Sequence, residues 1–249
     1  MSADLEPDQS PWSGRGFIAA AAVLGVIVAL GMAIVVSNLV GGGPGDPPVA
    51  AGDAAVDPSQ QTSSGDSDSV CGLTDVVLTG TVDQPPAAEW TLLGTIAVPA
   101  AKGIGPGVVE DDGFRHCYAH TPQGALFMSA NVAGMGGTRT LDRRVFDALT
   151  AAGPGRDAAL RDVADDSGSS TDAPGIRMQI AGFRILSYAG NRATVDLAFR
   201  VSTGATMVQA FELVWEHGDW KIRLTDDGDL PSEMAQVPDL TGYIPWGGA

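Results

Sequence analysis

The feature that most constrains this chain is an apolar segment near its N-terminus, residues 17–40, with the sequence FIAAAAVLGVIVALGMAIVVSNLV. It lies within a stretch of 30 residues, 16–45, that carries no charge, and 13 of its 24 residues are Phe, Ile, Leu or Val. A helix of about 20 apolar residues is long enough to cross a bilayer. The alternative, a cleaved signal peptide, has a shorter apolar region of about 7–15 residues and a small-residue cleavage site. The sequence therefore predicts an uncleaved transmembrane helix.

The basic residues around this segment predict its orientation. Arg15 directly precedes it, and the next Lys or Arg along the chain is Lys102. Because the cytoplasmic flanks of membrane helices are enriched in Lys and Arg, residues 1–16 are expected to form a cytoplasmic tail. The predicted location is the cell membrane, with a single pass, a cytoplasmic N-terminus and an extracellular C-terminal domain.

Small residues recur every four positions in the predicted helix and would form a ridge along one side of it. They are Ala21, Gly25, Ala29, Ala33 and Ser37. Such ridges let two membrane helices approach closely. Two interpretations stay open: the ridge packs against a second copy or another subunit, or an alanine-rich composition placed these residues there by chance.

The charge balance limits the partners that this chain can bind. Asp and Glu total 30 against 14 Lys and Arg, which gives a net charge of −16. Phosphate binding requires concentrated positive charge, so direct nucleic-acid binding is not expected. Two Cys are too few for a four-thiolate zinc site, and three His leave little for a histidine site. We therefore expect no cofactor and no metal.

Residues 41–70 differ in composition from the segments on both sides. They contain 6 Gly, 4 Pro, 5 Asp and 5 Ser, with no aromatic residue and no base. Such a segment cannot bury enough apolar surface to offset the entropy of ordering it, so a disordered acidic linker is expected. The remaining residues, 71–249, are expected to form one extracytoplasmic domain.

Both cysteines fall in that domain, on the oxidising side of the membrane. Two lone Cys there most often pair, so a disulfide between Cys71 and Cys117 is predicted. The alternative is metal binding, because Cys117 lies between His116 and His120. In a strand, however, residues 116, 118 and 120 would face one side and residue 117 the other, which separates these ligands. The disulfide is the favoured interpretation.

An extended segment and a helix are predicted in the first part of the domain. Residues 90–98 are expected to be extended. Thr121 followed by Pro122 is typical of an N-cap and a first helical residue, so a helix is expected to begin there and to end near Gly134.

Two more helices are expected before a loop at residues 165–175. Apolar residues repeat every four positions in the first, at Leu141, Val145 and Leu149. Gly153 and Pro154 are expected to stop it, because glycine caps a helix and proline cannot continue one. Residues 156–164 predict a short third helix with Leu160 and Val163 facing inward.

Residues 176–224 carry the clearest strand pattern in the chain. Apolar and polar residues alternate along four runs, which are separated by Gly190–Asn191, by Thr203–Gly204 and by residues 217–219. The parity changes at Gly182, as a β-bulge requires. This pattern predicts an antiparallel meander of four strands with one apolar face. Helices that precede it should pack on that face, which gives an α+β fold.

Several short stretches of the domain, together with the order of segments, carry a family resemblance. The stretches are Cys71-Gly72-Leu73, Cys117-Tyr118-Ala119 with the following TPQGAL, GPGRD at 153–157, Val214-Trp215-Glu216 with Gly218-Asp219-Trp220, and YIPWGG at 243–248. They are similar to an actinobacterial group of single-pass membrane proteins of integrative conjugative elements. The segment order resembles the bitopic TcpC-like scaffold subunits of type IV secretion and conjugation systems. The larger scaffolds carry two outer domains, and only one fits here.

The resemblance implies a nuclear-transport-factor-2-like domain, in which helices pack on a bent antiparallel sheet, and a function without catalysis. That function is a membrane-anchored structural component of a conjugative DNA-transfer apparatus, acting through extracytoplasmic protein contacts. The implied partners are the lipid bilayer, other subunits of the transfer complex and a second copy of the chain. The expected contact surfaces are the outer sheet face and residues 225–249. The latter carry no base and are otherwise expected to be a solvated tail, in which Trp246 packs on the domain.

Two other classes of function stay open. The first is a membrane-anchored ligand- or lipid-binding accessory protein, similar to Mce-associated proteins, that uses the pocket of the cone-shaped domain. An enzyme would need an acid or base in that pocket, but Asp196 and Glu212 fall on polar strand faces and His217 lies in a turn beside Asp219. No catalytic residue is therefore predicted. The other class is a surface regulator or immunity-like protein, which the sequence does not separate from a scaffold.

Overall fold

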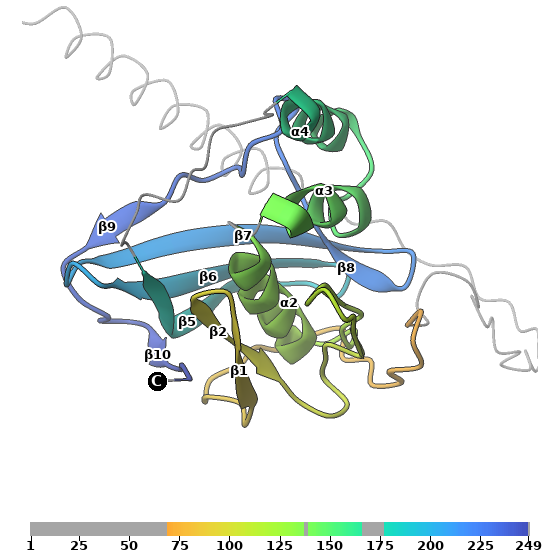
Figure 1. The fold of residues 1–249 in the computed structure, drawn as a ribbon. Helices are drawn as coiled ribbons and strands as arrows, with labels where there is room; N and C mark the ends of the chain where they lie inside the picture. Colours follow the sequence, from red (N-terminus) through yellow and green to blue (C-terminus); the bar gives the residue numbers. More distant parts are fainter. Residues whose placement is uncertain (1–68, 137–138, 166–176, 249) are drawn as a thin grey trace, which may run out of the picture. The chain divides into compact units, whose positions relative to one another are not determined.

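The computed structural model describes residues 69–136, 139–165 and 177–248, all within one compact unit, Gln60–Ala249. In this part of the chain three helices pack with a six-stranded antiparallel sheet, so the predicted α+β class is confirmed (Figure 1). The predicted tail, membrane helix and ridge lie outside the described residues, as do the linker up to residue 68 and the loop from residue 166. None of the helices within the described ranges is both long and apolar enough to cross a membrane.

The sheet is a meander extended by two short strands from the C-terminal part of the chain. It consists of β5 (Met178–Tyr188), β6 (Arg192–Val201), β7 (Thr206–Glu216), β8 (Asp219–Ile222), β9 (Ala235–Val237) and β10 (Ile244–Pro245). The strand order is β10-β5-β6-β7-β8, and β9 also pairs with β7. The four predicted strands are thus confirmed, and their alternating residues supply one buried face.

The predicted bulge at Gly182 is present. The same glycine also lets β10 approach the sheet. The register between β5 and β6 shifts between Ile180 and Gly182. A Cβ atom on Gly182 would lie 3.0 Å from the Ile244 carbonyl oxygen. Glycine therefore lets the backbone of β10 approach β5 closely.

The turn between β7 and β8 is shorter than the sequence suggested. His217 and Gly218 have positive φ values of 52° and 75°, and Glu216 pairs directly with Asp219. Two residues with positive φ make the type I′ turn that matches the twist of a hairpin. The expectation that Asp219 belongs to the turn is therefore wrong, because it is the first residue of β8.

Helix α2 (Pro122–Met135) lies between the sheet and a hairpin, and it begins as predicted. The Thr121 hydroxyl accepts a hydrogen bond from the N–H of Gly124 at 3.0 Å and caps the helix. Nearly all of its residues are buried, as is typical of a helix that is covered on all sides. Its end at Met135 is one residue beyond the predicted Gly134.

The hairpin beside α2 corrects the prediction for residues 90–98. That segment is two strands, β1 (Glu89–Leu93) and β2 (Ile96–Ala100), rather than one extended run. Gly94 has a φ of 59°, as the first position of a type II′ turn requires. Two more short strands, β3 (Val108–Val109) and β4 (Arg115–His116), pair with each other.

The boundary between α3 (Arg139–Ala148) and α4 (Pro154–Asp165) also differs from the prediction. Helix α3 ends at Ala148 because the chain then pairs with β8: Ile222 N–H donates to the Leu149 carbonyl at 2.7 Å. Gly153 and Pro154 do not stop α3, since Pro154 is instead the first residue of α4.

The buried side of α4 was predicted only in part. Leu160 and Val163 are half-buried, whereas the buried residues are Gly155, Ala158 and Ala159. A Cβ atom on Gly155 would collide with the Thr225 carbonyl. The helix therefore meets the chain after β8 through small residues.

The segment after β8 is part of the fold, although most of its side chains are exposed, as expected for a solvated segment. It adds β9 to β7 and β10 to β5. Trp246 is 6% exposed, and its ring lies 4.8 Å from Trp90, 5.4 Å from Phe127 and 5.5 Å from Phe183, between centroids. Its Nε1 donates to the Pro86 carbonyl at 3.0 Å. The prediction that Trp246 packs on the domain is confirmed.

Candidate functional site

The first described residues, 69–78, form a segment that we call the strap. It begins with a turn, in which the Gly72 N–H donates to the Ser69 carbonyl at 3.3 Å, and then runs beside His120, with which Val76 forms a parallel bridge. Its Cys71 is joined to Cys117 by a disulfide, with the two Cα atoms 6.3 Å apart, as predicted. The N–H of Val70 also donates to the Gly218 carbonyl at 3.1 Å. The strap is therefore tied to the domain both covalently and by its backbone, where the predicted linker meets the domain.

A second attachment lies seven residues after Val70. The N–H of Val77 donates to the His120 carbonyl at 2.9 Å, and the Tyr188 hydroxyl donates to the Val77 carbonyl at 2.6 Å. Burial raises the pKa of this tyrosine to about 12, so it remains a donor at neutral pH. These bonds hold the strap extended along the edge of the domain.

Behind the disulfide, the carboxylate of Asp219 joins two segments far apart in sequence. It accepts hydrogen bonds from the N–H groups of Cys117, Tyr118 and Trp220, each at 2.9 Å. Burial raises the pKa of Asp219, while Lys221 and the three N–H donors act in the opposite direction and offset only part of that effect. Asp219 is 2% exposed, so its role is to hold the backbone near the disulfide.

The structure separates the histidines near Cys117 in a different way from that predicted. The chain does not continue as a strand through residue 120, because β4 ends at His116 and Cys117 has a φ of 71°. His116 Nε2 lies 3.4 Å from Glu110 Oε1, and buried His120 stacks on Trp215 with ring centroids 4.0 Å apart. Within the described ranges no group of three metal-ligating side chains comes together.

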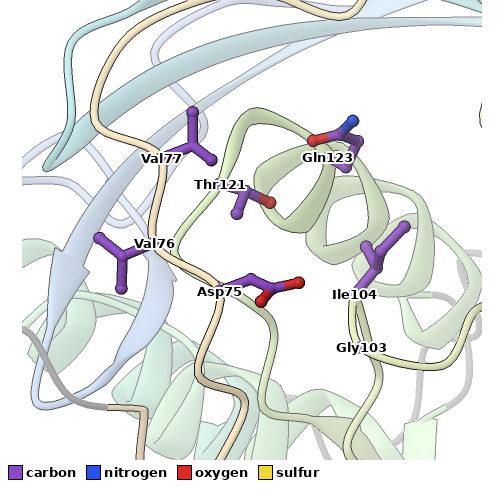
Figure 2. A pocket seen from close by; sticks show the side chains of 7 residues that line it. All are labelled: Asp75, Val76, Val77, Gly103, Ile104, Thr121 and Gln123. Carbon is purple, nitrogen blue, oxygen red and sulfur yellow. The ribbon is translucent and has the colours of Figure 1, made fainter.

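A cleft of about 340 Å³ opens between the strap and the start of α2 (Figure 2). It is lined by Asp75, Val76 and Val77 of the strap, Gly103 and Ile104 of the loop after β2, and Thr121 and Gln123. Figure 2 shows the Asp75 side chain directed from the strap into this space. A Cβ atom on Gly103 would lie 4.0 Å from Asp75 Oδ2, so Asp75 faces the loop after β2.

The lining of the cleft holds one ionisable side chain among neutral ones. This side chain is Asp75, and the Thr121 hydroxyl is already engaged in capping α2. General acid–base catalysis uses a group placed against the reacting atoms, commonly with a second group that tunes or orients it. The lining instead combines one carboxylate and the Gln123 amide with aliphatic carbons.

The carboxylates expected on the outer sheet face have different surroundings. Glu212 pairs with Arg223 at 2.8 Å, and His217 is exposed in its turn. Asp196 is only 4% exposed, although it lies on the polar face of its strand. It accepts hydrogen bonds from Arg184 at 2.8 Å and from the Tyr243 hydroxyl at 2.6 Å.

Asp196 thus fixes the chain just before β10. Burial, and the hydrogen bond to the Asp196 carboxylate, raise the pKa of Tyr243 to about 12. The ring of Tyr243 also lies under the Arg184 guanidinium, 4.5 Å from its centroid. The C-terminal segment covers this part of the outer face, so the alternation of the strand alone could not show that Asp196 is buried.

Of the cleft and the strap, the sequence identified only the cysteine and the helix cap. Thr121 was predicted as an N-cap and Cys71 as half of a disulfide, whereas Asp75 and Gln123 were not singled out. One signal was available: Val76, Val77 and Leu78 form an aliphatic run soon after a strongly polar segment.

The comparisons with known proteins give a family but no function. No curated protein and no solved structure matches the chain. A family model described as a domain of unknown function, DUF8175, matches residues 50–245, which include the strap, the sheet and β10. The match covers most of the chain, which therefore belongs to the DUF8175 family.

Proposed function

We propose that this protein is a non-enzymatic, membrane-anchored structural component of a conjugative DNA-transfer apparatus related to type IV secretion. In this proposal residues 17–40 anchor the chain, and the domain acts through protein contacts on the extracytoplasmic side. Its partners are other subunits of the transfer complex, with self-association through the ridge in the membrane. The resemblance of the sequence to conjugation scaffolds motivates this assignment.

The observation that best supports a contact module is the packing of Trp246, from the C-terminal segment, in the apolar core. Trp246 packs against Trp90, Phe127 and Phe183, so the chain's own side chain fills this part of the core. The chain thus uses its own C-terminal segment to complete its apolar core. What it leaves for a partner is the surface, including the strap and the cleft.

The disulfide supports an extracytoplasmic location. Disulfides persist in oxidising compartments and are rare in the cytosol. The bond between Cys71 and Cys117 closes the domain just after the predicted linker. It is consistent with the orientation that Arg15 predicts for the membrane helix.

A finer fold assignment belongs to the same proposal. We infer that the domain is a nuclear-transport-factor-2-like domain. The bulge at Gly182 bends the sheet, and α2 packs against the buried face of β5 and β6. This arrangement is what that fold predicts for helices on a bent antiparallel sheet.

The test is the frequency of conjugative transfer from donor cells in which this gene is deleted. The proposal predicts a large loss of transfer, restored by the full-length chain expressed from a second site. Unchanged transfer in the deletion strain, with normal growth, would show that the protein has no part in the apparatus. A chain lacking residues 1–40 is the matched control and is expected not to restore transfer.

A further inference from the structure

We propose that the strap and the adjoining cleft dock an extended segment of another protein that carries Lys or Arg among apolar side chains. The partner adds a strand along residues 75–78, and its basic side chain enters the cleft to pair with Asp75. This proposal rests on the proposed function, because it names the contact surface and the chemistry of the partner.

The first observation is an exposed aliphatic run in the strap. Val76, Val77 and Leu78 are 46%, 45% and 53% exposed, although all three lie in a well-anchored extended segment. Three consecutive apolar residues facing water are unfavourable in a soluble domain unless they serve a contact. The run therefore indicates a surface that is covered in the assembled complex.

The second observation is an open backbone edge. Val77 directs its N–H and C=O toward the domain, where they bond to His120 and Tyr188. In an extended chain the neighbouring residue directs these groups the opposite way. The backbone of Val76 has no hydrogen-bond partner in the part of the chain that the structure describes. An extended peptide can bond to such an edge by strand addition.

The third observation is the charge of the cleft. Asp75 forms no ion pair with any described base, including Lys102 beside the cleft. The carboxylate therefore remains free for a positive group that enters between the strap and α2 (Figure 2). Electrostatic complementarity of this kind selects partners and fixes their register.

The charges of the chain argue against the nearest alternatives as the occupant of the cleft. A second copy also carries a net charge of −16, so docking of like charge is disfavoured. The chain's own residues 1–68 contain Arg15 as their single base, and it lies before the predicted membrane helix. The base is therefore expected to come from another protein.

The experiment is photocrosslinking of the full-length chain in cells that contain the transfer apparatus. A benzophenone amino acid replaces Val76 in one variant and Leu92, an exposed aliphatic residue of β1, in a matched control. The adduct is digested, and the crosslinked segment is sequenced by mass spectrometry. We expect position 76 to capture a segment of another protein that has Lys or Arg within about four residues of the adduct. A strand paired with the strap would place residues at that separation close enough for the basic side chain to enter the cleft.

Charge reversal tests the role of the carboxylate. Asp75→Lys is expected to lower the yield of that adduct about tenfold, because two positive groups would then face each other. Asp83→Lys is the control, since it makes the same charge change at an exposed position outside the cleft and should leave the yield unchanged. Formation of the disulfide in each variant, read on a non-reducing gel, confirms that the domain is folded.

Other results would overturn the docking site. They are an adduct to a second copy, an adduct to a segment without a base, equal capture from position 92, no adduct at all, or a yield that Asp75→Lys leaves unchanged. If deletion of the gene abolishes transfer while any of these is observed, the proposed function stands and the docking site does not. If transfer is unaffected by the deletion, the function itself is wrong.

Discussion

At the scale of single residues, Asp219 and Tyr118 show two ways of burying a polar group. The Asp219 carboxylate accepts three backbone N–H groups. The Tyr118 hydroxyl is buried and has no hydrogen-bond partner within the described residues. Burial, which is complete, raises the pKa of Tyr118 well above its ordinary value, so the hydroxyl stays neutral. A buried polar group without a partner costs about 1–3 kcal/mol.

We therefore expect Tyr118→Phe to raise the free energy of unfolding by about 1 kcal/mol, because it removes the unpaired hydroxyl and keeps the ring. Tyr188→Phe is the matched control. This variant removes a hydroxyl that donates to the Val77 carbonyl, so it should lower the free energy of unfolding by about 1 kcal/mol. Urea unfolding of the full-length chain in detergent measures both. A loss of stability in Tyr118→Phe would mean that its hydroxyl has a partner.

The raised pKa of Asp219 predicts a pH dependence of stability. The folded-state pKa lies above the ordinary value of 3.8, so the folded state binds this proton more tightly than the unfolded state does. The stabilising contribution is fully present below pH 3.8 and is lost as the pH rises through the folded-state pKa.

The comparison that isolates this effect is with Asp219→Asn, which does not titrate at this position. The free energy of unfolding of the native protein, minus that of the variant, should fall between pH 3 and pH 7. Urea titrations at a series of pH values give this difference. An increase with pH over the same range would contradict the assignment of a raised pKa.

At the scale of elements, the strap depends on its disulfide more than on packing. Its side chains from residue 74 to residue 78 are exposed, and its backbone bonds are few. The cross-link joins cysteines 46 positions apart. A closed loop of this size stabilises by about 4 kcal/mol in the chain-entropy model.

Replacing both cysteines, Cys71→Ser with Cys117→Ser, should therefore lower the free energy of unfolding by about 4 kcal/mol. It should also make the strap the first site of limited proteolysis, because only hydrogen bonds then hold it. The native protein treated with reductant is the control and should behave in the same way. A change below about 1 kcal/mol would show that packing alone holds the strap.

The C-terminal element makes a second prediction. Trp246→Ala removes a large ring from contact with Trp90, Phe127 and Phe183 and should cost about 3–5 kcal/mol. Trp246→Phe keeps an aromatic ring but loses the hydrogen bond to Pro86, so it should cost less than the alanine variant. Thermal unfolding compares the two variants. If both variants lowered the stability by the same small amount, the ring of Trp246 would not be part of the core.

How far the sequence predicted these elements depended on the length of each pattern. The alternation of apolar residues along β5 to β8 was long enough to reveal the meander, and Gly182 marked its bulge. In contrast, β9 and β10 have three and two residues, too few for any periodicity. The β1–β2 hairpin was missed because Leu92, Leu93 and Ile96 give a nearly continuous apolar run, although Gly94 was a signal for the turn.

The candidate site was less predictable than the fold, for a physical reason. Backbone hydrogen bonds hold the strap in place, and these leave no trace in the side-chain pattern. Asp75 and Gln123 are neighbours only because the strap returns to the start of α2 after the disulfide. Cys71, Cys117 and Thr121 could be predicted because their roles depend on residue type and on immediate neighbours. The cleft could not be predicted, because its lining comes from three segments that are distant in the sequence.

At the scale of the whole molecule, a predicted membrane helix precedes a disulfide-linked domain. In the proposed function the domain acts through protein contacts, and the net charge of −16 is unfavourable for binding nucleic acid. The family match begins at residue 50, within the predicted linker, and ends at residue 245. The predicted anchor precedes that match.

The most direct test of the whole account is the topology of the full-length chain in intact cells. Leu92→Cys places a thiol at an exposed position of β1, where a membrane-impermeant maleimide can reach it. We expect labelling without lysis, on a chain that stays in the membrane fraction after an alkaline wash. Labelling that requires lysis, or release of the chain into the medium, would contradict this topology.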